Sequence, residues 1–383
     1  MKRVYLDYAA ATPVRREVLL EMRKYGHIFA NPSSVHALGV AARELLESVR
    51  EKVGKILGAG SSDKIIFTAG GTESINLALL GVVRANTQRG KHIITSSVEH
   101  KAVLETCKQL EKEGFSVDYV GVDSNGMVNV QELVRLVRKD TILISIQYVN
   151  NETGIIQSLS ELCRSVREKS SSVIIHTDAC QAGLLDLNVK KLGVDLLTLN
   201  SSKIYGPHGV GMLYIRDGVS VLPLMLGGGQ EYGLRSGTEN VEGVVGFVYA
   251  LGLLQKERGK ELRRLEGLRK KFVKKLCENI DDVFVVSDLK KSMPGILSVG
   301  FLEVEAETLV KSLSVLGVYV SAGSACTAQQ IEVSHVLRAM RVEDDVARGV
   351  IRFSLGRGTM LEDLQQTVMC TKKVVESLRK VLL

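Results

Sequence analysis

Short apolar segments alternate along the first 240 residues with longer segments whose apolar residues recur every three or four positions. Residues 40–57 show the longer pattern, which predicts a helix with one apolar stripe. Residues 65–67 (IIF) show the shorter pattern, which predicts a buried strand. Further strands are predicted at residues 93–95, 117–120, 142–149, 173–176, 194–199 and 211–215. Strands that alternate with amphipathic helices predict an α/β domain built on a mostly parallel sheet.

The pattern changes after about residue 240. Residues 251–279 form a long charged segment with an apolar stripe, which predicts one long helix. Shorter strands are predicted near 284–286, 296–301 and 350–353, and this mixture is typical of a smaller α+β domain. We therefore predict a large domain over residues 15–245 and a small domain over 246–383, with residues 1–14 packing on the small one.

Composition and charge exclude several classes of protein. The 383 residues are 45% apolar, but no apolar run approaches the roughly 20 residues of a membrane span. No secretory signal is visible at the N-terminus, so we expect a cytoplasmic protein. The net charge of +7 comes from basic residues interspersed with acidic ones, and aromatic residues are only 5%, so no nucleic-acid surface is predicted. The six cysteines form no CxxC pair and therefore suggest neither a zinc site nor a disulfide framework.

Two polar residues follow neighbouring predicted strands and suggest a cofactor. Asp178 ends the strand that begins near residue 173, and Lys203 follows the strand at 194–199. Pyridoxal phosphate (PLP) chemistry needs an amine that condenses with the aldehyde and a carboxylate that keeps the pyridine nitrogen protonated. Polar residues in loops after strands are common, so this pair alone leaves an ordinary structural role open.

Residues that can bind a phosphate or a flat ring occur after other strands. Gly71 and Thr72 follow a strand and open a helix, where free N–H groups favour a phosphate. An ordinary glycine-rich helix cap is the alternative. His100 follows the strand near residue 95 and can stack on a ring or transfer protons, although its position alone favours a surface or capping histidine.

Polar residues at other strand ends and in loops can bind a cofactor or a carboxylate. Asn151 and Gln181 offer amides, with simple turns as the alternative. Thr238 lies in a glycine-rich loop that suits an anion, or is a plain surface residue. Arg352 lies inside an apolar run and therefore needs an anionic partner, either a ligand or a structural carboxylate. Cys326 lies in a run of small residues, where a thiol is exposed and reactive or merely incidental to a turn.

Taken in order, these segments resemble the cysteine desulfurases, in the class V group of fold-type I PLP enzymes. The motifs lie at residues 5–13, 31–34, 149–154 (VNNETG), 176–181 (HTDACQ), 203–207 (KIYGP), 235–238 (RSGT), 323–326 (GSAC) and 351–357 (IRFSLGR). The resemblance covers nearly the whole chain. It implies a large domain with a mostly parallel seven-stranded sheet and a smaller C-terminal domain.

The resemblance also implies a role for each candidate around PLP. Lys203 would bind the cofactor covalently and move protons, Asp178 would pair with the ring nitrogen, and His100 would stack on the ring. Other residues would contact the ring hydroxyl or the phosphate: Gln181, Gly71, Thr72, Asn200, Ser202 and, from the partner subunit of a homodimer, Thr238.

Substrate and partners follow from the same resemblance. Asn151 and Arg352 would hold the carboxylate of L-cysteine. Cys326 would attack the substrate sulfur, form a persulfide and leave alanine. The persulfide would pass to an acceptor protein, either an iron–sulfur scaffold or another carrier that serves thio-cofactor or tRNA biosynthesis. Another class V enzyme, such as a selenocysteine lyase, and a non-catalytic sulfur-transfer adaptor remain the alternatives.

Three features of the sequence bear on these expectations. Relatives usually have Ser-Gly-His or a close variant before the lysine, whereas this chain has Asn200, Ser201 and Ser202. We therefore expect weaker PLP retention than is usual. The chain also ends without the extension that many relatives use to bind a scaffold protein, which puts that partnership in question. Residues 327–333 resemble the family branch with a longer cysteine loop.

Overall fold

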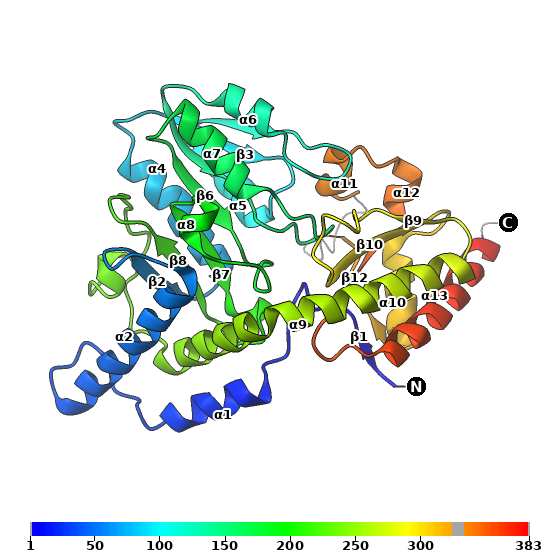
Figure 1. The fold of residues 1–383 in the computed structure, drawn as a ribbon, viewed down its shortest axis with the longest axis horizontal. Helices are drawn as coiled ribbons and strands as arrows, with labels where there is room; N and C mark the ends of the chain where they lie inside the picture. The colour runs from blue at the N-terminus through cyan, green and yellow to red at the C-terminus, as the bar shows by residue number, and fades with distance from the viewer. Residues whose placement is uncertain (1, 324–332, 382–383) are drawn as a thin grey trace.

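A seven-stranded sheet forms the centre of the first part of the chain (Figure 1). The computed structural model describes residues 2–323 and 333–381. The strand order is β2-β8-β7-β6-β5-β3-β4. The strands are β2 (Lys64–Thr68), β3 (His92–Ser96), β4 (Ser116–Val120), β5 (Thr141–Ser145), β6 (Ile174–Asp178), β7 (Leu196–Asn200) and β8 (Gly211–Ile215).

Strand direction in this sheet is mixed but mainly parallel. Strands β4, β3, β5, β6 and β7 pair in parallel, whereas β8 runs antiparallel to both β7 and β2. The prediction of a mostly parallel α/β sheet of seven strands is confirmed. The carboxyl ends of the parallel strands meet at one edge of the sheet, which is where open α/β sheets bind ligands.

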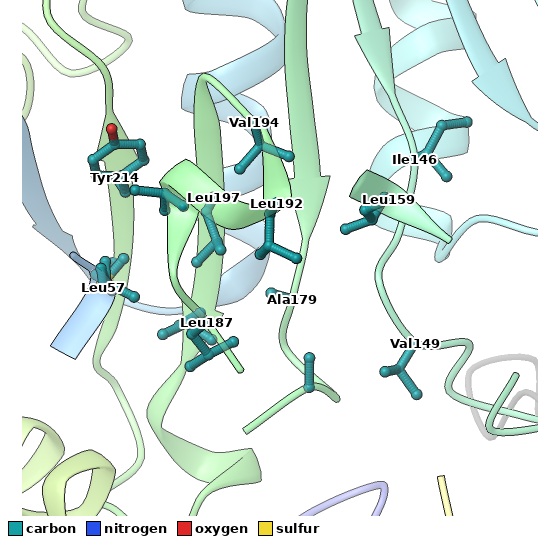
Figure 2. Packing of buried hydrophobic residues seen from close by; sticks show 14 of the residues in the cluster. Leu57, Ile146, Val149, Leu159, Ala179, Leu187, Leu192, Val194, Leu197 and Tyr214 are labelled. Atoms are coloured by element: carbon teal, nitrogen blue, oxygen red, sulfur yellow. The ribbon is translucent and has the colours of Figure 1, made fainter. Parts of the chain in front are cut away.

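Helices cover both faces of this sheet because alternate strand residues are apolar on both sides. Leu197 and Ile175 belong to one core, while Leu196 and Ile174 belong to the other. Figure 2 shows part of the first core, with Leu192 of helix α8 packed near Leu197 of β7. The helices of this part are α1 (Arg16–Tyr25), α2 (Ala37–Leu57), α3 (Gly71–Asn76), α4 (Val82–Ala85), α5 (Lys101–Lys112), α6 (Val130–Leu136), α7 (Leu159–Lys169) and α8 (Val189–Leu192).

A smaller sheet with its own core follows in the second part of the chain (Figure 1). Its strand order is β12-β10-β9, and β1 near the N-terminus pairs separately with β11. The strands are β1 (Val4–Tyr5), β9 (Val283–Val285), β10 (Ile296–Phe301), β11 (Val318–Tyr319) and β12 (Val350–Ser354). The helices are α9 (Val241–Asn279), α10 (Ala306–Val315), α11 (His335–Ala339), α12 (Asp344–Arg348) and α13 (Leu361–Val381).

Helix α9 connects the two cores. Phe247 packs in the core of the large sheet and Phe272 in that of the small sheet. The predicted domain boundary at residues 245 and 246 therefore falls inside a continuous helix. Across residues 2–323 and 333–381, no helix is both long and apolar enough to span a membrane.

Two elements differ from their predictions for local reasons. The strand expected over residues 142–149 ends at Ser145, and the N–H of Gln147 donates to both oxygens of the buried Glu99 carboxylate, each at 3.0 Å. The helix that Gly71 and Thr72 open is interrupted by a π-helical turn at Leu77–Gly81, where the i→i−5 spacing inserts one extra residue.

Candidate active site

Asp178 and Lys203 lie together at the carboxyl edge of the large sheet. Asp178 is the last residue of β6, and β7 ends at Asn200, from which a short 3₁₀ turn leads to Lys203. Strands β6 and β7 are parallel neighbours, so both residues leave the sheet at the same edge. They line one cavity of about 270 Å³.

Most of the other predicted site residues line the same cavity. They are Gly71, Thr72, His100, Asn151, Gln181, Asn200 and Arg352. Ser202 and Thr238 are not part of this lining, and Thr238 is exposed on the described surface of this chain. Cys326 lies outside the described residues, but Gly323, three positions before it, is on the cavity wall.

The amine of Lys203 is half-buried and faces the N-terminal segment. Its Nζ donates to the carbonyl oxygen of Ala9 at 3.0 Å and also to that of Ala10. Gln181 donates from Nε2 to the same Ala9 carbonyl at 2.8 Å. Burial lowers the pKa of Lys203 below its usual value, which favours the neutral, nucleophilic amine.

Asp178 is a buried carboxylate with one oxygen engaged by the backbone. Its Oδ1 accepts the N–H of Cys180 at 2.9 Å, and only 8% of the residue is exposed. Burial, and then the negative charge of Asp178, raise the pKa of the Cys180 thiol well above its usual value. Cys180 therefore carries its proton beside the carboxylate, and a cation in the cavity is the partner that would stabilise Asp178.

The start of helix α3 approaches β6 and β7 closely at Gly71. A Cβ atom at this position would lie 2.8 Å from Sγ of Cys180 and 3.3 Å from Cβ of Asn200. Glycine is therefore required for the helix to begin here, with Thr72 next to it on the cavity wall. The first N–H groups of helix α3 have no partner within the helix and therefore suit an anion.

His100 is the N-cap of helix α5. Its Nδ1 accepts the N–H of Ala102 at 3.1 Å, so the neutral ring carries its proton on Nε2. Burial lowers the pKa of His100, and the charge of Asp178 partly offsets that effect. His100 therefore both caps helix α5 and lines the cavity.

Arg352 in strand β12 is held from two sides. Nη1 donates to the carbonyl oxygen of Asn151 at 2.8 Å, and Nη2 donates to Oδ1 of Asp7 at 2.9 Å. Only 3% of Arg352 is exposed. Its Nε is buried and has no hydrogen-bond partner among the described residues. The structural carboxylate considered from sequence therefore exists, and Arg352 also lines the cavity.

Comparisons with known proteins agree with this geometry. Residues 4–367 match the class-V aminotransferase family. The chain is 47% identical to the cysteine desulfurase IscS of Dictyoglomus turgidum, over 100% of this chain and 97% of that protein. It is 40% identical to cysteine desulfurase IscS 1 of Archaeoglobus fulgidus, over 98% of this chain and 97% of that protein. The chain belongs to the cysteine desulfurases.

Solved structures support the same assignment. A NifS-like protein superposes on the desulfurase with a TM-score of 0.91 at 41% identity, covering 98% of this chain and 99% of that one. A protein titled SspA in complex with cysteine gives a TM-score of 0.81 at 35% identity, covering 92% and 98%. Both the fold class and the family inferred from the sequence motifs are confirmed.

The family implies PLP as the cofactor, and the cavity fits it. The amine of Lys203, the buried carboxylate of Asp178 and the helix start at Gly71 supply partners for an aldehyde, a ring nitrogen and a phosphate. The close approach at Gly71 leaves no room for a side chain between the helix start and the residues that follow the strands. Lys203, Asp178 and Gly71 come from separate elements in and around the large sheet, yet they line one cavity. This arrangement is an observation independent of the family match.

Three residues of this site were missed from the sequence. Glu99, next to His100 in the chain, is fully buried, and burial raises its pKa to about 8. His335 and Glu152 line the cavity itself. No local pattern distinguishes His335, which lies far from the other residues in sequence. Glu152 lies within the 149–154 motif, so its position next to Asn151 was an available signal.

Proposed function

We propose that the desulfurase converts L-cysteine to L-alanine and carries the released sulfur as a persulfide on Cys326. The observation that carries this proposal is the single cavity lined by Lys203, Asp178, Arg352 and Gly323. The residues proposed to bind the cofactor and the substrate carboxylate thus share one cavity with Gly323, three positions before Cys326.

The cofactor is held by residues from several elements. PLP, when bound, supplies an electron sink that labilises bonds to the carbon bearing the amino group. Lys203 would bind it and move protons, and Asp178 would stabilise positive charge on its ring. His100, with its proton on Nε2, would contact the ring. The remaining contacts are assigned to Gln181, Gly71, Thr72, Asn200, Ser202 and, from a partner subunit, Thr238.

Arg352 and Asn151 hold the carboxylate of the substrate. The contacts to Asp7 and to the Asn151 carbonyl orient the guanidinium before any ligand arrives. The positive charge of this guanidinium, on a residue that lines the cavity, favours substrates that carry a carboxylate there.

The sulfur transfer balances without an external oxidant. The thiolate of Cys326 attacks the substrate sulfur, an S–S bond forms, and the bond from sulfur to the β-carbon breaks. The electron pair of that bond stays with the carbon skeleton, which gains a proton and becomes alanine. L-cysteine and a thiol thus give alanine and a persulfide.

We also propose that the desulfurase is a homodimer and serves a sulfur-acceptor protein. Thr238 is exposed on a single chain, and Leu226 and Tyr232 in the same region are 83% and 54% exposed. Such apolar exposure beside a predicted phosphate ligand suits a surface covered by a second copy. Names of relatives such as IscS support an acceptor in iron–sulfur cluster assembly. A carrier in thio-cofactor or tRNA biosynthesis is the alternative.

A comparison of two variants tests the proposal. Desulfurase loaded with PLP should produce alanine and sulfide from L-cysteine in the presence of a thiol reductant. Cys326→Ala should abolish both products, while the exposed Cys277→Ala should behave as the parent enzyme. Continued alanine production by Cys326→Ala would favour a lyase without a persulfide carrier.

A further inference from the structure

An ion pair joins the first turn of helix α3 to a glycine-rich loop that comes much later in the chain. Nε of Arg235 donates to Oε1 of Glu73 at 2.9 Å, although the two residues are 162 positions apart. Glu73 follows Gly71 and Thr72, which line the cavity. The side chains of Arg235 and Glu73 are only 21% and 23% exposed. The pair therefore connects the loop directly to the turn that offers N–H groups to an anion.

The other oxygen of Glu73 binds the backbone just before the helix. Its Oε2 accepts the N–H of Ala69 at 2.8 Å. This contact is similar to one half of a capping box, in which an acidic side chain of the first turn reaches back to an N–H at the helix start. The other half is missing, because the N-cap is Gly70 and supplies no side-chain hydrogen bond. The helical stretch runs on through the π-helical turn and α4 to Ala85, so its free N–H groups carry the partial positive charge of a long helix.

The charge of Glu73 creates a conflict at this helix start. A helix N-terminus favours an anion, and the carboxylate of Glu73 is already one. A phosphate bound at the same turn brings further negative charge. Two like charges within about one helical turn of each other repel, and after partial screening by solvent this repulsion weakens binding on the order of tenfold. A cation in contact with Glu73 removes most of that repulsion, and Arg235 is such a cation.

The loop that carries Arg235 is anchored to the edge of the large sheet. Glu231, four residues earlier, binds Arg50 through both carboxylate oxygens, each at 2.8 Å. Oε2 of Glu231 also accepts the N–H of Phe67 at 2.8 Å, in the edge strand β2. Only 5% of Glu231 is exposed. Because this buried contact fixes the loop beside the strand that leads into α3, Arg235 is held close to Glu73.

We propose that Arg235 is a positioning residue for the cofactor phosphate and acts through Glu73. Arg235 cancels the charge of this carboxylate and keeps it directed at Ala69, so that the first N–H groups of α3 stay open to the phosphate. Arg235 does not contact the phosphate in this account. The proposal rests on the proposed assignment of the phosphate to Gly71 and Thr72.

Titrations of the cofactor-free desulfurase with PLP and with pyridoxal, which lacks the phosphate, test the proposal. Both are followed by absorbance. Arg235→Gln should weaken PLP binding about tenfold and leave pyridoxal binding unchanged, because only PLP meets the uncompensated carboxylate. Glu73→Gln should bind PLP at least as tightly as the parent, since the amide keeps an oxygen for Ala69 without the charge. The double variant should return to within about threefold of the parent, because the charge that Arg235 compensates is gone.

A matched control removes an ion pair elsewhere in the large domain. Nη2 of Arg84 lies 2.7 Å from Oε1 of Glu113, and neither residue belongs to the described lining of the cavity. Arg84→Gln should therefore keep the parent affinity for both ligands. Parent-like PLP binding by Arg235→Gln, or an equal loss of pyridoxal binding, would overturn the proposal.

The double variant separates this account from direct contact with the phosphate. If Arg235 touched the phosphate itself, replacing Glu73 as well would not restore PLP binding, and that result would also overturn the proposal. The assignment of the phosphate is checked separately with Thr72→Ala, which should weaken the binding of PLP but not of pyridoxal. Unchanged PLP binding by Thr72→Ala would show that the assignment itself is wrong.

Discussion

Replacing Gly71 with alanine tests how closely helix α3 must approach the sheet. The new Cβ would lie 2.8 Å from Sγ of Cys180 and 3.3 Å from Cβ of Asn200, whereas ordinary contacts begin near 3.4 Å. The bond from its N–H to Asp178 holds the backbone of Cys180, so relief requires either rotation of its side chain or movement of the helix start. Movement by more than half an ångström would take the helix start away from the position that suits the cofactor phosphate.

The expected loss of PLP affinity follows from the known free-energy cost of overpacking a buried site. Insertion of a methyl group into a packed site costs about 1–3 kcal/mol. The better helix propensity of alanine offsets less than about 1 kcal/mol of this at a helix start. A net cost of about 2 kcal/mol in the bound state corresponds to about thirtyfold weaker PLP binding.

Titration of the cofactor-free desulfurase with PLP, followed by absorbance, measures this loss. The double variant Gly71→Ala with Cys180→Ala should recover most of the affinity, because the closest atom is removed. Gly70→Ala is a steric control for stability, since its Cβ would meet nothing within 4 Å and its backbone is extended. Unchanged affinity in Gly71→Ala, or no recovery in the double variant, would refute the reasoning.

Two further predictions concern pH and cofactor retention. His176 lies buried between the hydroxyls of Ser145 and Thr198, and burial lowers its pKa to about 4. In the unfolded protein His176 takes up a proton near pH 6.5, whereas in the native protein it stays neutral down to about pH 4. The free energy of unfolding should therefore fall by about 3 kcal/mol as the pH drops from above 6.5 to about 4. Urea unfolding of His176→Gln should show a smaller loss over this range, and an equal loss would contradict the assignment. For retention, Ser202→His should keep more PLP than the parent enzyme after prolonged dialysis, and full occupancy in the dialysed parent would show that the histidine is not needed.

Much of the large sheet was predictable because its signals are local. A strand such as Gly211–Ile215 is a run of mostly apolar residues, and the structure places it at the predicted positions. The antiparallel direction of β8 was not predictable in this way, because direction depends on which strands become neighbours. The early end of β5 at Ser145 depends on Glu99, a residue almost 50 positions earlier in the chain.

The site was predictable where its residues follow strands. Asp178 and Asn200 end β6 and β7, and parallel strands bring such ends together. His335 and the ion pair between Asp7 and Arg352 join remote parts of the chain, and only the fold brings them together. Thr238 lies outside the cavity lining of one chain, as a residue offered to a partner subunit would.

The central claim is that Cys326 receives sulfur from L-cysteine. The direct measurement is the mass of the peptide containing Cys326 after the PLP-loaded enzyme has reacted with L-cysteine without reductant. The account predicts a gain of one sulfur atom on this peptide, reversed by a thiol reductant and matched by one alanine per active site. Alanine formation with an unmodified Cys326 peptide would contradict it.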